Sequence, residues 1–340
     1  MAHYLVTGGG GFIGSHLVEE LLRRGNRVRV LDNFATGKRE NIAALLAALR
    51  DEQPQVDFAG RLEVVEGDVR SYHIVREAVE GVDFVLHQAA LPSVPRSVKD
   101  PITSNEVNVV GTLNILNAAK ETGVRRIVYA SSSSIYGDLE TLPKTEDMLP
   151  KPLSPYAVSK LAGEKYCQVF TRLYGLETVC LRYFNVFGPR QDPASQYSAV
   201  IPKFIRLIAQ GERPTVYGDG SQSRDFTYVG NVVQANLLAC EAAPEECSGE
   251  VFNIAYGRRV TINELVRVLN ELLGRNVEPI YAEPRLGDVK HSLANIGKAR
   301  QYLGYNPEID FAEGLRRCVA FFMRQERIEA EQQRKETVHG

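Results

Sequence analysis

The sequence predicts an α/β fold in which helices cover both faces of a doubly wound parallel sheet. Three observations support this prediction: short apolar segments alternate with amphipathic ones, a glycine-rich turn follows the first apolar segment, and the composition is ordinary for a globular protein. Hydrophobic residues make up 44% of the 340 residues and charged residues 24%, so the chain can bury a large core. Regular strand–helix alternation is typical of parallel sheets, because a helix usually makes each crossover.

The first half of the chain supplies the expected elements in order. Residues 4–6 and 27–31 are expected as strands on either side of a helix at 13–24, whose apolar residues recur on one face. A polar insertion at 36–60 contains an expected helix at 39–50. Further buried strands are expected at 62–66, 84–88, 126–130 and 178–182, with helices at 109–121 and 155–174.

The glycine-rich turn at residues 6–14 links the first strand to the first helix. Gly8, Gly11 and Gly14 leave the backbone without side chains, so a pyrophosphate can approach the free N–H groups of the helix N-terminus. Asp32 lies 18 residues beyond Gly14, at the end of the second strand, where a carboxylate would bind the adenosine ribose. A carboxylate there would repel a 2′-phosphate, so the pattern predicts a Rossmann-type domain that binds NAD rather than NADP.

The alternation weakens after residue 182, and segments such as 195–211 and 286–293 are expected to form a smaller appended α/β region. We therefore expect an NAD-binding domain at 1–182 to which some later segments return. Residues 183–325 would mainly bind the substrate, and 326–340 would form a polar tail.

Two later strands also end on the side of the sheet where NAD is expected to bind. Asp68 could bond the adenine amino group, although an aspartate there could equally cap the next helix. Ala89 and Ala90 are small and leave room for the cofactor, whereas His87 is expected to be a hydrogen-bonded core histidine.

The predicted chemical centre combines Tyr156 and Lys160 with a serine run at 131–134. Tyr156 and Lys160 are one helical turn apart and share a face. The lysine ammonium is expected to lower the pKa of the phenol, and the phenolate could then remove a hydroxyl proton from a substrate. A serine hydroxyl at the strand end could bind the same substrate oxygen and relay its proton.

Composition argues against several other classes of function. The net charge of −2 gives no reason to expect binding to nucleic acid or to a membrane surface, and no apolar run is long enough to cross a membrane. Five scattered cysteines form no C-x-x-C pair, and the six histidines show no metal spacing, so no metal site is expected. A cytoplasmic location without disulfides fits best.

Together, the motifs resemble those of the UDP-hexose 4-epimerase family of extended short-chain dehydrogenase/reductases, and most closely the bacterial UDP-N-acetylglucosamine 4-epimerases. The similarity runs from Thr7 to about Phe322. Its marks are residues 7–14, 87–90, 93–97, 100–105, 142–144, 151–160, 181–188, 223–226 and 287–293.

The resemblance implies a mechanism in which Tyr156 removes the proton of the sugar's C4 hydroxyl while the C4 hydride passes to bound NAD. The 4-keto sugar then rotates in the site, and the hydride returns to the opposite face of C4. Ser132 matches the family's proton-relay position, with Ser133 and Ser134 left open as alternatives. The implied NAD contacts are Gly8, Gly11, Phe12, Ile13, Gly14, Asp32, Asn33, Asp68, Val69, Ala89, Ala90, Asn108, Tyr156, Lys160 and Tyr183.

The resemblance also implies a site for a UDP-sugar. Arg224 and Arg285 would pair with the diphosphate, to which guanidinium groups are well suited, and Asn185 would contact the diphosphate or the sugar. Val200, Tyr217 and Asp288 would surround the uridine and its ribose. Ser93, Ser132, Tyr156 and Ser292 complete the implied substrate contacts.

Ser292 matches the family's gate beside the sugar's C2 group, where a bulky side chain would exclude an N-acetyl group. Serine leaves space, which favours UDP-GlcNAc/UDP-GalNAc together with UDP-glucose/UDP-galactose. Pro92 departs from the glycine that N-acetyl-specific relatives usually carry, which weighs against a strict preference for acetylated sugars.

Other functions share these features. A nucleotide-sugar 4,6-dehydratase or a UDP-glucuronate-acting epimerase or decarboxylase would have the same fold, NAD and Tyr156. The dehydratases and decarboxylases carry acidic residues where this chain has Ser133 and Ser134. A non-catalytic NAD sensor is the alternative of another class, and it would not need the set of Ser132, Tyr156 and Lys160. The family also implies a homodimer built from the helices at 109–121 and 155–174.

Overall fold

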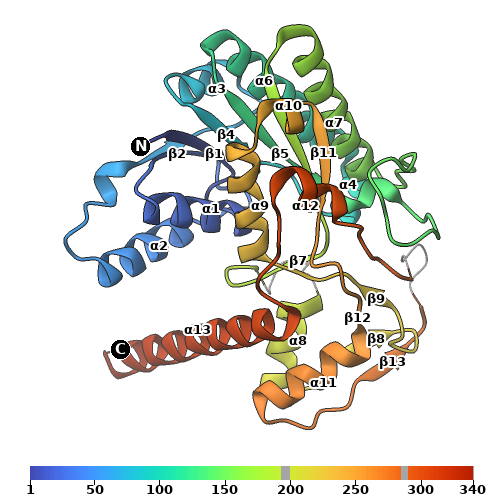
Figure 1. The fold of residues 1–340 in the computed structure, drawn as a ribbon. Coiled ribbons are helices and arrows are strands. Elements are labelled where there is room, and N and C mark those ends of the chain that lie inside the picture. Colours follow the sequence, from blue (N-terminus) through green and yellow to red (C-terminus); the bar gives the residue numbers. More distant parts are fainter. Residues whose placement is uncertain (193–199, 285–289, 340) are drawn as a thin grey trace.

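The computed structural model describes residues 1–192, 200–284 and 290–339, and side chains as far as residue 328. A seven-stranded sheet forms its centre, in the order β11-β6-β5-β4-β1-β2-β3, with every neighbouring pair parallel. Helices lie on both faces of the sheet (Figure 1), so the expected doubly wound α/β fold is confirmed. The sheet strands are β1 (His3–Thr7), β2 (Arg27–Asp32), β3 (Leu62–Glu66), β4 (Phe84–His87), β5 (Arg126–Ser132), β6 (Glu177–Tyr183) and β11 (Glu250–Ile254).

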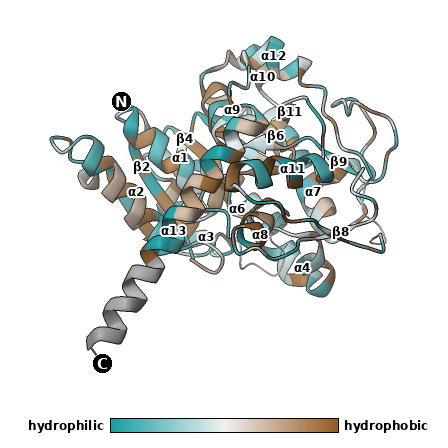
Figure 2. Cartoon of the chain, turned by 90° about the horizontal axis from the view of Figure 1, so that it is seen from below, coloured by the Kyte–Doolittle hydropathy of each residue, from teal (hydrophilic) through white to brown (hydrophobic). Residues whose placement is uncertain are grey.

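Two apolar layers separate the sheet from its helices, because successive strand residues point to opposite faces. In β1, Val6 packs in one layer while Leu5 packs in the other. The first layer is covered by α1 (Phe12–Arg23), α2 (Arg39–Glu52), α9 (Val229–Glu241) and α12 (Gly297–Leu303). The second is covered by α3 (Tyr72–Val79), α6 (Gly111–Thr122) and α7 (Pro155–Tyr174). Helices α1 and α2 accordingly carry both hydrophobic and hydrophilic residues in Figure 2.

Short elements connect the sheet strands and their helices. Residues 101–122 form one helical run whose middle, η2 (Glu106–Val110), is a π-helix, a feature that is frequent at functional sites. The other connecting elements are η1 (Ala59–Arg61), α4 (Val94–Lys99), α5 (Pro101–Asn105), η3 (Ser133–Tyr136) and α10 (Pro244–Cys247).

A second, smaller region has its own core. Its buried residues come from α8, α11, the start of α13 and the segments around Phe187 and Phe226. The region lies below the sheet in Figure 1. Its elements are β7 (Val186–Phe187), α8 (Val200–Ala209), β8 (Thr215–Tyr217), β9 (Ser223–Arg224), β10 (Thr227–Tyr228), β12 (Val260–Thr261), α11 (Ile262–Leu273), β13 (Ile280–Ala282) and α13 (Phe311–His339).

The expectation that residues 62–66 form a buried strand is wrong. Strand β3 lies at the edge of the sheet, and the Val64 side chain is 41% exposed. Its apolar residues resemble those of a central strand, but among the described strands it pairs with β2 alone. Strand β11 was not among the strands expected in the main sheet. It lies far along the chain, but it pairs with β6 in that sheet.

Candidate active site

The residues singled out in the first half of the chain meet at one edge of the sheet. Strands β1, β2, β4 and β5 end at Thr7, Asp32, His87 and Ser132. Thr7 is in register with His87, and Ser132 with Tyr183. Because the carboxyl ends of parallel strands share an edge, the predicted cofactor and catalytic residues gather there.

The glycine turn has the shape of a phosphate cradle. Gly8 has φ +70°, and a Cβ on it would lie 2.9 Å from the backbone nitrogen of Ala89. A Cβ on Gly14 would overlap the carbonyl oxygen of Gly8, so helix α1 can approach β1 only because this residue is glycine. Gly11 immediately precedes α1. The first N–H groups of α1, including those of Phe12 and Ile13, therefore stand beside a backbone surface without side chains.

Asp32 holds the glycine turn against the next loop. Its Oδ2 accepts a hydrogen bond from Gly10 N at 2.8 Å, and its Oδ1 accepts one from Phe34 N at 2.8 Å. Each carboxylate oxygen has two lone pairs, so both can accept further donors such as ribose hydroxyls.

Asp68 is engaged in a small polar cluster beside Asp32. It accepts hydrogen bonds from Asn33 Nδ2 at 2.9 Å and from the Arg70 guanidinium at 2.8 Å. The hydrogen bonds from Arg70 lower the pKa of the Asp68 carboxyl to about 2. The residue that directly precedes α3 is Ser71, so Asp68 does not cap that helix as one interpretation had it. Val69, next to it, is buried.

The end of β4 is fixed by its neighbours. His87 is a core histidine, as expected, with Nδ1 2.7 Å from Thr7 Oγ1 and Nε2 3.0 Å from Thr112 Oγ1. Thr7 Oγ1 also accepts a hydrogen bond from Ala89 N at 3.1 Å, which places Ala89 and Ala90 over the glycine turn. Apart from its position at the end of β1, nothing in the sequence indicates this role of Thr7.

Asn108 connects three segments of the site. Its Oδ1 accepts a hydrogen bond from Leu91 N at 2.8 Å, and its Nδ2 donates to Ser159 Oγ at 3.0 Å. The π-helix η2 therefore supports both the loop after β4 and the helix that carries Tyr156.

Helix α7 begins and ends at clear local signals. Ser154 Oγ accepts a hydrogen bond from Ala157 N at 3.2 Å, Pro155 occupies the first helical position, and Gly175 ends the helix in the left-handed conformation. Tyr156 N also donates to Ser97 Oγ at 3.0 Å. Ser97, which the sequence reasoning did not single out by itself, thus fixes the turn that carries Tyr156.

The side chain of Tyr156 interacts with that of Ser132. Burial raises the pKa of Tyr156, and the interaction with Ser132 partly opposes this rise. Lys160 donates to the carbonyl oxygen of Ala130 at 2.7 Å, and burial lowers the pKa of its ammonium to about 8. The pKa of Tyr156 therefore shifts upward, opposite to the direction expected from Lys160, and burial is the largest cause.

The serine run divides into different environments. Ser131 Oγ donates to Glu164 Oε1 at 2.5 Å and is turned toward the buried Glu164–Arg182 ion pair, which sequence reasoning missed. Ser132 Oγ accepts a hydrogen bond from Ser134 N at 3.2 Å and contacts Tyr156. Within the described part of the chain, the buried Ser134 Oγ has no hydrogen-bond partner. The geometry thus pairs Ser132, and not its neighbours, with the phenol.

Tyr183 closes the site beside Ser132. Its hydroxyl donates toward Gln88 Oε1 at 3.2 Å and accepts a hydrogen bond from Asn236 Nδ2 at 2.8 Å. Burial raises the pKa of Tyr183 to about 12, so this phenol stays neutral at physiological pH.

The predicted substrate residues come from separate segments of the second region. Asn185 Nδ2 lies 3.5 Å from Ser292 Oγ, which brings two of them together. Arg224 lies on β9, and its guanidinium donates to the carbonyl oxygens of Ser223 and Lys290 at 3.0 and 3.2 Å. Tyr217 ends β8, and Val200 begins α8. Ser93 precedes α4 with φ +98°. Arg285 and Asp288 lie outside the described residues.

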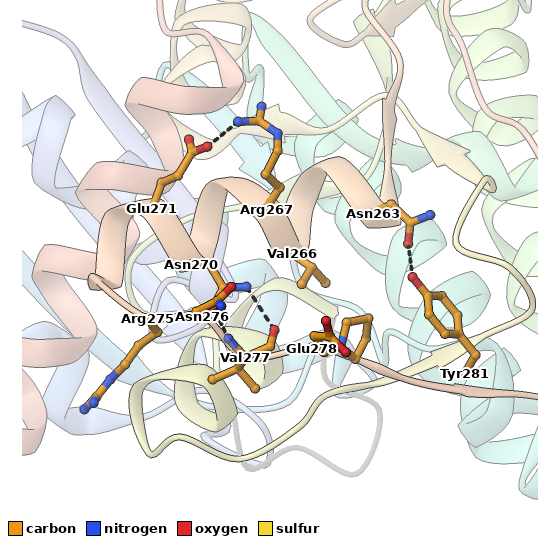
Figure 3. Close-up of a pocket in the computed structure, with 11 residues that line it drawn as sticks. Asn263, Val266, Arg267, Asn270, Glu271, Arg275, Asn276, Val277, Glu278 and Tyr281 are labelled. Atoms are coloured by element: carbon orange, nitrogen blue, oxygen red, sulfur yellow. Dashed lines mark hydrogen bonds and ion pairs between the residues drawn. The ribbon is translucent and has the colours of Figure 1, made fainter.

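A pocket of about 390 Å³ lies elsewhere, between α11 and residues 275–281 (Figure 3). Arg267 and Glu271 pair on one side of it, and the Tyr281 hydroxyl donates to Asn263 Oδ1 at 3.1 Å on another. None of the predicted site residues lines this pocket, so it is distinct from the strand-end site. Across the ranges that the structure describes, no helix is long and apolar enough to cross a membrane.

Comparisons with known proteins agree on one family. The model of the NAD dependent epimerase/dehydratase family matches residues 4–255. A putative UDP-glucose 4-epimerase of Methanocaldococcus jannaschii is 40% identical over 317 residues, which cover 93% of this chain and 96% of the relative.

Two solved structures are similar over nearly the whole chain. The UDP-N-acetylglucosamine 4-epimerase of Methanobrevibacter ruminantium in complex with UDP-N-acetylmuramic acid has a TM-score of 0.87 and 39% identity, covering 95% of this chain and 99% of that one. The UDP-glucose 4-epimerase of Thermus thermophilus in complex with NAD has a TM-score of 0.82 and 38% identity, covering 94% and 99%.

Proposed function

Since the chain belongs to the NAD-dependent epimerase/dehydratase family, we propose that it is a UDP-hexose 4-epimerase. It would interconvert UDP-GlcNAc with UDP-GalNAc, and also UDP-glucose with UDP-galactose. The observation that carries the proposal is the interaction of the Tyr156 side chain with Ser132, which ends β5 at the carboxyl end of the sheet. This pair can hold and move a hydroxyl proton next to a bound dinucleotide.

In this proposal, Tyr156 and Ser132 both contact the C4 hydroxyl of the sugar. Ser132 passes the hydroxyl proton to the phenolate and returns a proton when the opposite epimer forms. Burial raises the pKa of Tyr156, so its phenolate needs a positive neighbour. Lys160, one helical turn away on α7, is proposed to supply this charge, and its hydrogen bond to Ala130 fixes its ammonium beside β5.

The glycine turn fits NAD, because only residues without a Cβ at Gly8 and Gly14 allow the close backbone packing that forms the cradle. When bound, NAD supplies the acceptor and the donor of the C4 hydride. Asp32 would accept hydrogen bonds from the adenosine ribose while it holds Gly10. The other residues proposed to hold NAD are Gly11, Phe12, Ile13, Asn33, Asp68, Val69, Ala89, Ala90, Asn108, Tyr156, Lys160 and Tyr183.

The UDP-sugar is proposed to lie between the strand ends and the second region. Arg224, together with Arg285, would bind the diphosphate, and Asn185 would contact the diphosphate or the sugar. Val200, Tyr217 and Asp288 would surround the uridine. Ser93 and Ser292 would stand near the sugar ring, where the small Ser292 side chain leaves room for an N-acetyl group.

A homodimer is part of the proposal. Apolar side chains are exposed on α7 and on α4 and α5, which pack against it. Val169 and Leu173 on α7 are 45% and 66% exposed, and Ile102 on α5 is 72% exposed. Exposed apolar side chains on helices that pack together are typical of an interface, and a second copy of the chain would cover this surface with the same surface. We name it the α5–α7 patch, made of Val98, Ile102, Val158, Val169 and Leu173.

Separate incubations with UDP-glucose, UDP-GlcNAc and UDP-GlcA, followed by NMR of the products, test the proposal. We expect C4 epimers of the first two sugars. A 4-keto-6-deoxy product would indicate a dehydratase, and a pentose product would indicate a decarboxylase. No turnover of any UDP-sugar, with NAD bound, would contradict the proposal and leave the non-catalytic sensor.

A further inference from the structure

Asp225 is a fully buried carboxylate that lies between β9 and β10 and has no role in the proposed proton transfer. It accepts hydrogen bonds from the backbone of two other segments. Tyr256 N and Gly257 N, after β11, donate to it at 3.2 and 3.1 Å, and Ala294 N donates at 3.1 Å. Three stretches of chain that are distant in sequence therefore meet at one side chain.

The partners of this carboxylate are neutral. Among the described residues, no lysine or arginine nitrogen forms an ion pair with Asp225. Burial raises the pKa of the Asp225 carboxyl to about 7, although the backbone N–H groups oppose the rise. Burying a carboxylate without a neighbouring cation costs free energy of desolvation. The hydrogen bonds that Asp225 accepts must offset this cost.

Proposed UDP-sugar contacts lie in two of these stretches and in the segment after β6. Arg224 directly precedes Asp225. Asn185 Nδ2 donates to the carbonyl oxygen of Asp225 at 3.3 Å and lies 3.5 Å from Ser292 Oγ. Ser292 is two residues before Ala294, and its backbone N donates to Ser223 O at 3.1 Å.

Only a carboxylate suits this place. Both carboxylate oxygens accept hydrogen bonds, so the backbone N–H groups of Tyr256, Gly257 and Ala294 all have a partner. Asparagine has the same shape, but its NH₂ group would face an N–H donor and leave at least one buried group unsatisfied.

We propose that Asp225 is a positioning residue for the UDP-sugar, which holds Arg224, Asn185 and Ser292 in their relative places without touching the substrate itself. The inference rests on the proposed function, because it concerns the same site. It predicts that loss of the carboxylate weakens UDP-sugar binding and leaves the proton transfer and the cofactor site intact.

The test compares Asp225→Asn with Leu269→Ala. Leu269 is fully buried on α11 in the core of the second region and is not one of the proposed substrate contacts, so its variant controls for a general loss of stability. Titration calorimetry with UDP, steady-state kinetics, bound NAD content and Tm are measured for both. We expect Asp225→Asn to raise the UDP Kd and the KM at least about tenfold, with kcat within about threefold and NAD content unchanged.

Equal UDP Kd and KM values in the two variants at a similar loss of Tm would overturn the inference, because they would show a merely structural role. If Asp225→Asn is insoluble, hydrogen exchange on the wild-type protein decides. UDP must then slow exchange at Gly257 and Ala294, and unchanged exchange would contradict the inference. Wild-type protein that binds UDP but turns over no UDP-sugar would refute the proposed function alone, whereas failure to bind UDP would refute both.

Discussion

The side chain of Tyr156 interacts with Ser132, although four consecutive serines end this strand and lead into the next turn. The strand pleat explains the selection. Ser131 and Ser132 point to opposite faces of the sheet, and Ser131 is taken by Glu164. Ser133 and Ser134 already belong to the 3₁₀ turn that follows. A run that the sequence left ambiguous is thus resolved by backbone geometry.

Ser132→Ala should therefore lower kcat more than the same change at its neighbours. We expect a loss of roughly 10²-fold or more, because a positioned proton relay contributes about that much. Ser133→Ala and Ser134→Ala are matched controls and should stay within about tenfold of the wild type. Initial rates on UDP-glucose and UDP-GlcNAc check this, and a larger loss at Ser133 or Ser134 would move the relay to that residue.

Tyr156→Phe should remove the base while keeping the ring. We expect kcat to fall by roughly 10³-fold or more with NAD content unchanged, because only the hydroxyl is lost. Single-turnover kinetics and the absorbance of released cofactor measure the two quantities. Near-normal turnover would refute the assigned base.

The main sheet could be predicted from the sequence because its signals are local. The glycine turn, the apolar runs and the caps of α7 are each encoded within a few residues. Long-range pairing is not encoded in this way. The return of β11 to the side of β6, and the edge position of β3, depend on contacts between residues far apart in sequence.

The same limit explains what was missed in the site. Asp225 lay within a segment that carries the family resemblance, but its partners Gly257 and Ala294 follow some 30 and 70 residues later, so no spacing could reveal them. The direction predicted for the pKa shift of Tyr156 was wrong for a related reason. Helical spacing indicates which side chains share a face, whereas burial depends on everything packed around them.

Ser292 should decide how well an N-acetyl sugar is accepted. Ser292→Tyr would place a ring beside Asn185, so we expect kcat/KM for UDP-GlcNAc to fall at least about tenfold more than for UDP-glucose. Ser292→Ala is the control and should leave the ratio nearly unchanged. An equal loss of kcat/KM for both sugars would show that Ser292 supports the fold or diphosphate binding and does not select the C2 group.

Two buried histidines should make the protein sensitive to acid. Burial lowers the pKa of His87 and of His16 from 6.5 to about 3. Between these values the unfolded chain binds more protons than the folded one, so the free energy of unfolding falls as the pH falls from 6.5 toward 3. Each histidine should lower the free energy of unfolding by about 2 kcal/mol at pH 5 relative to pH 7.

His87→Gln tests this linkage. Its free energy of unfolding should change less between pH 7 and pH 5 than that of the wild type, even if it is lower at both. His73→Gln, at an exposed position, is the control and should keep the wild-type slope. Urea titrations at both pH values give the comparison, and identical slopes in all three proteins would contradict the account.

The α5–α7 patch should hold two copies of the chain together. Val169→Glu places a charge within the patch, where burial against a partner would leave that charge unpaired, so we expect the dimer to dissociate. Ala44→Glu adds the same charge to an exposed position on α2, which covers the other face of the sheet, and should leave the dimer intact. Light scattering after size-exclusion chromatography measures the mass of each variant. A monomeric wild type, or a Val169→Glu protein that remains dimeric, would show that a different surface or a different partner covers the patch.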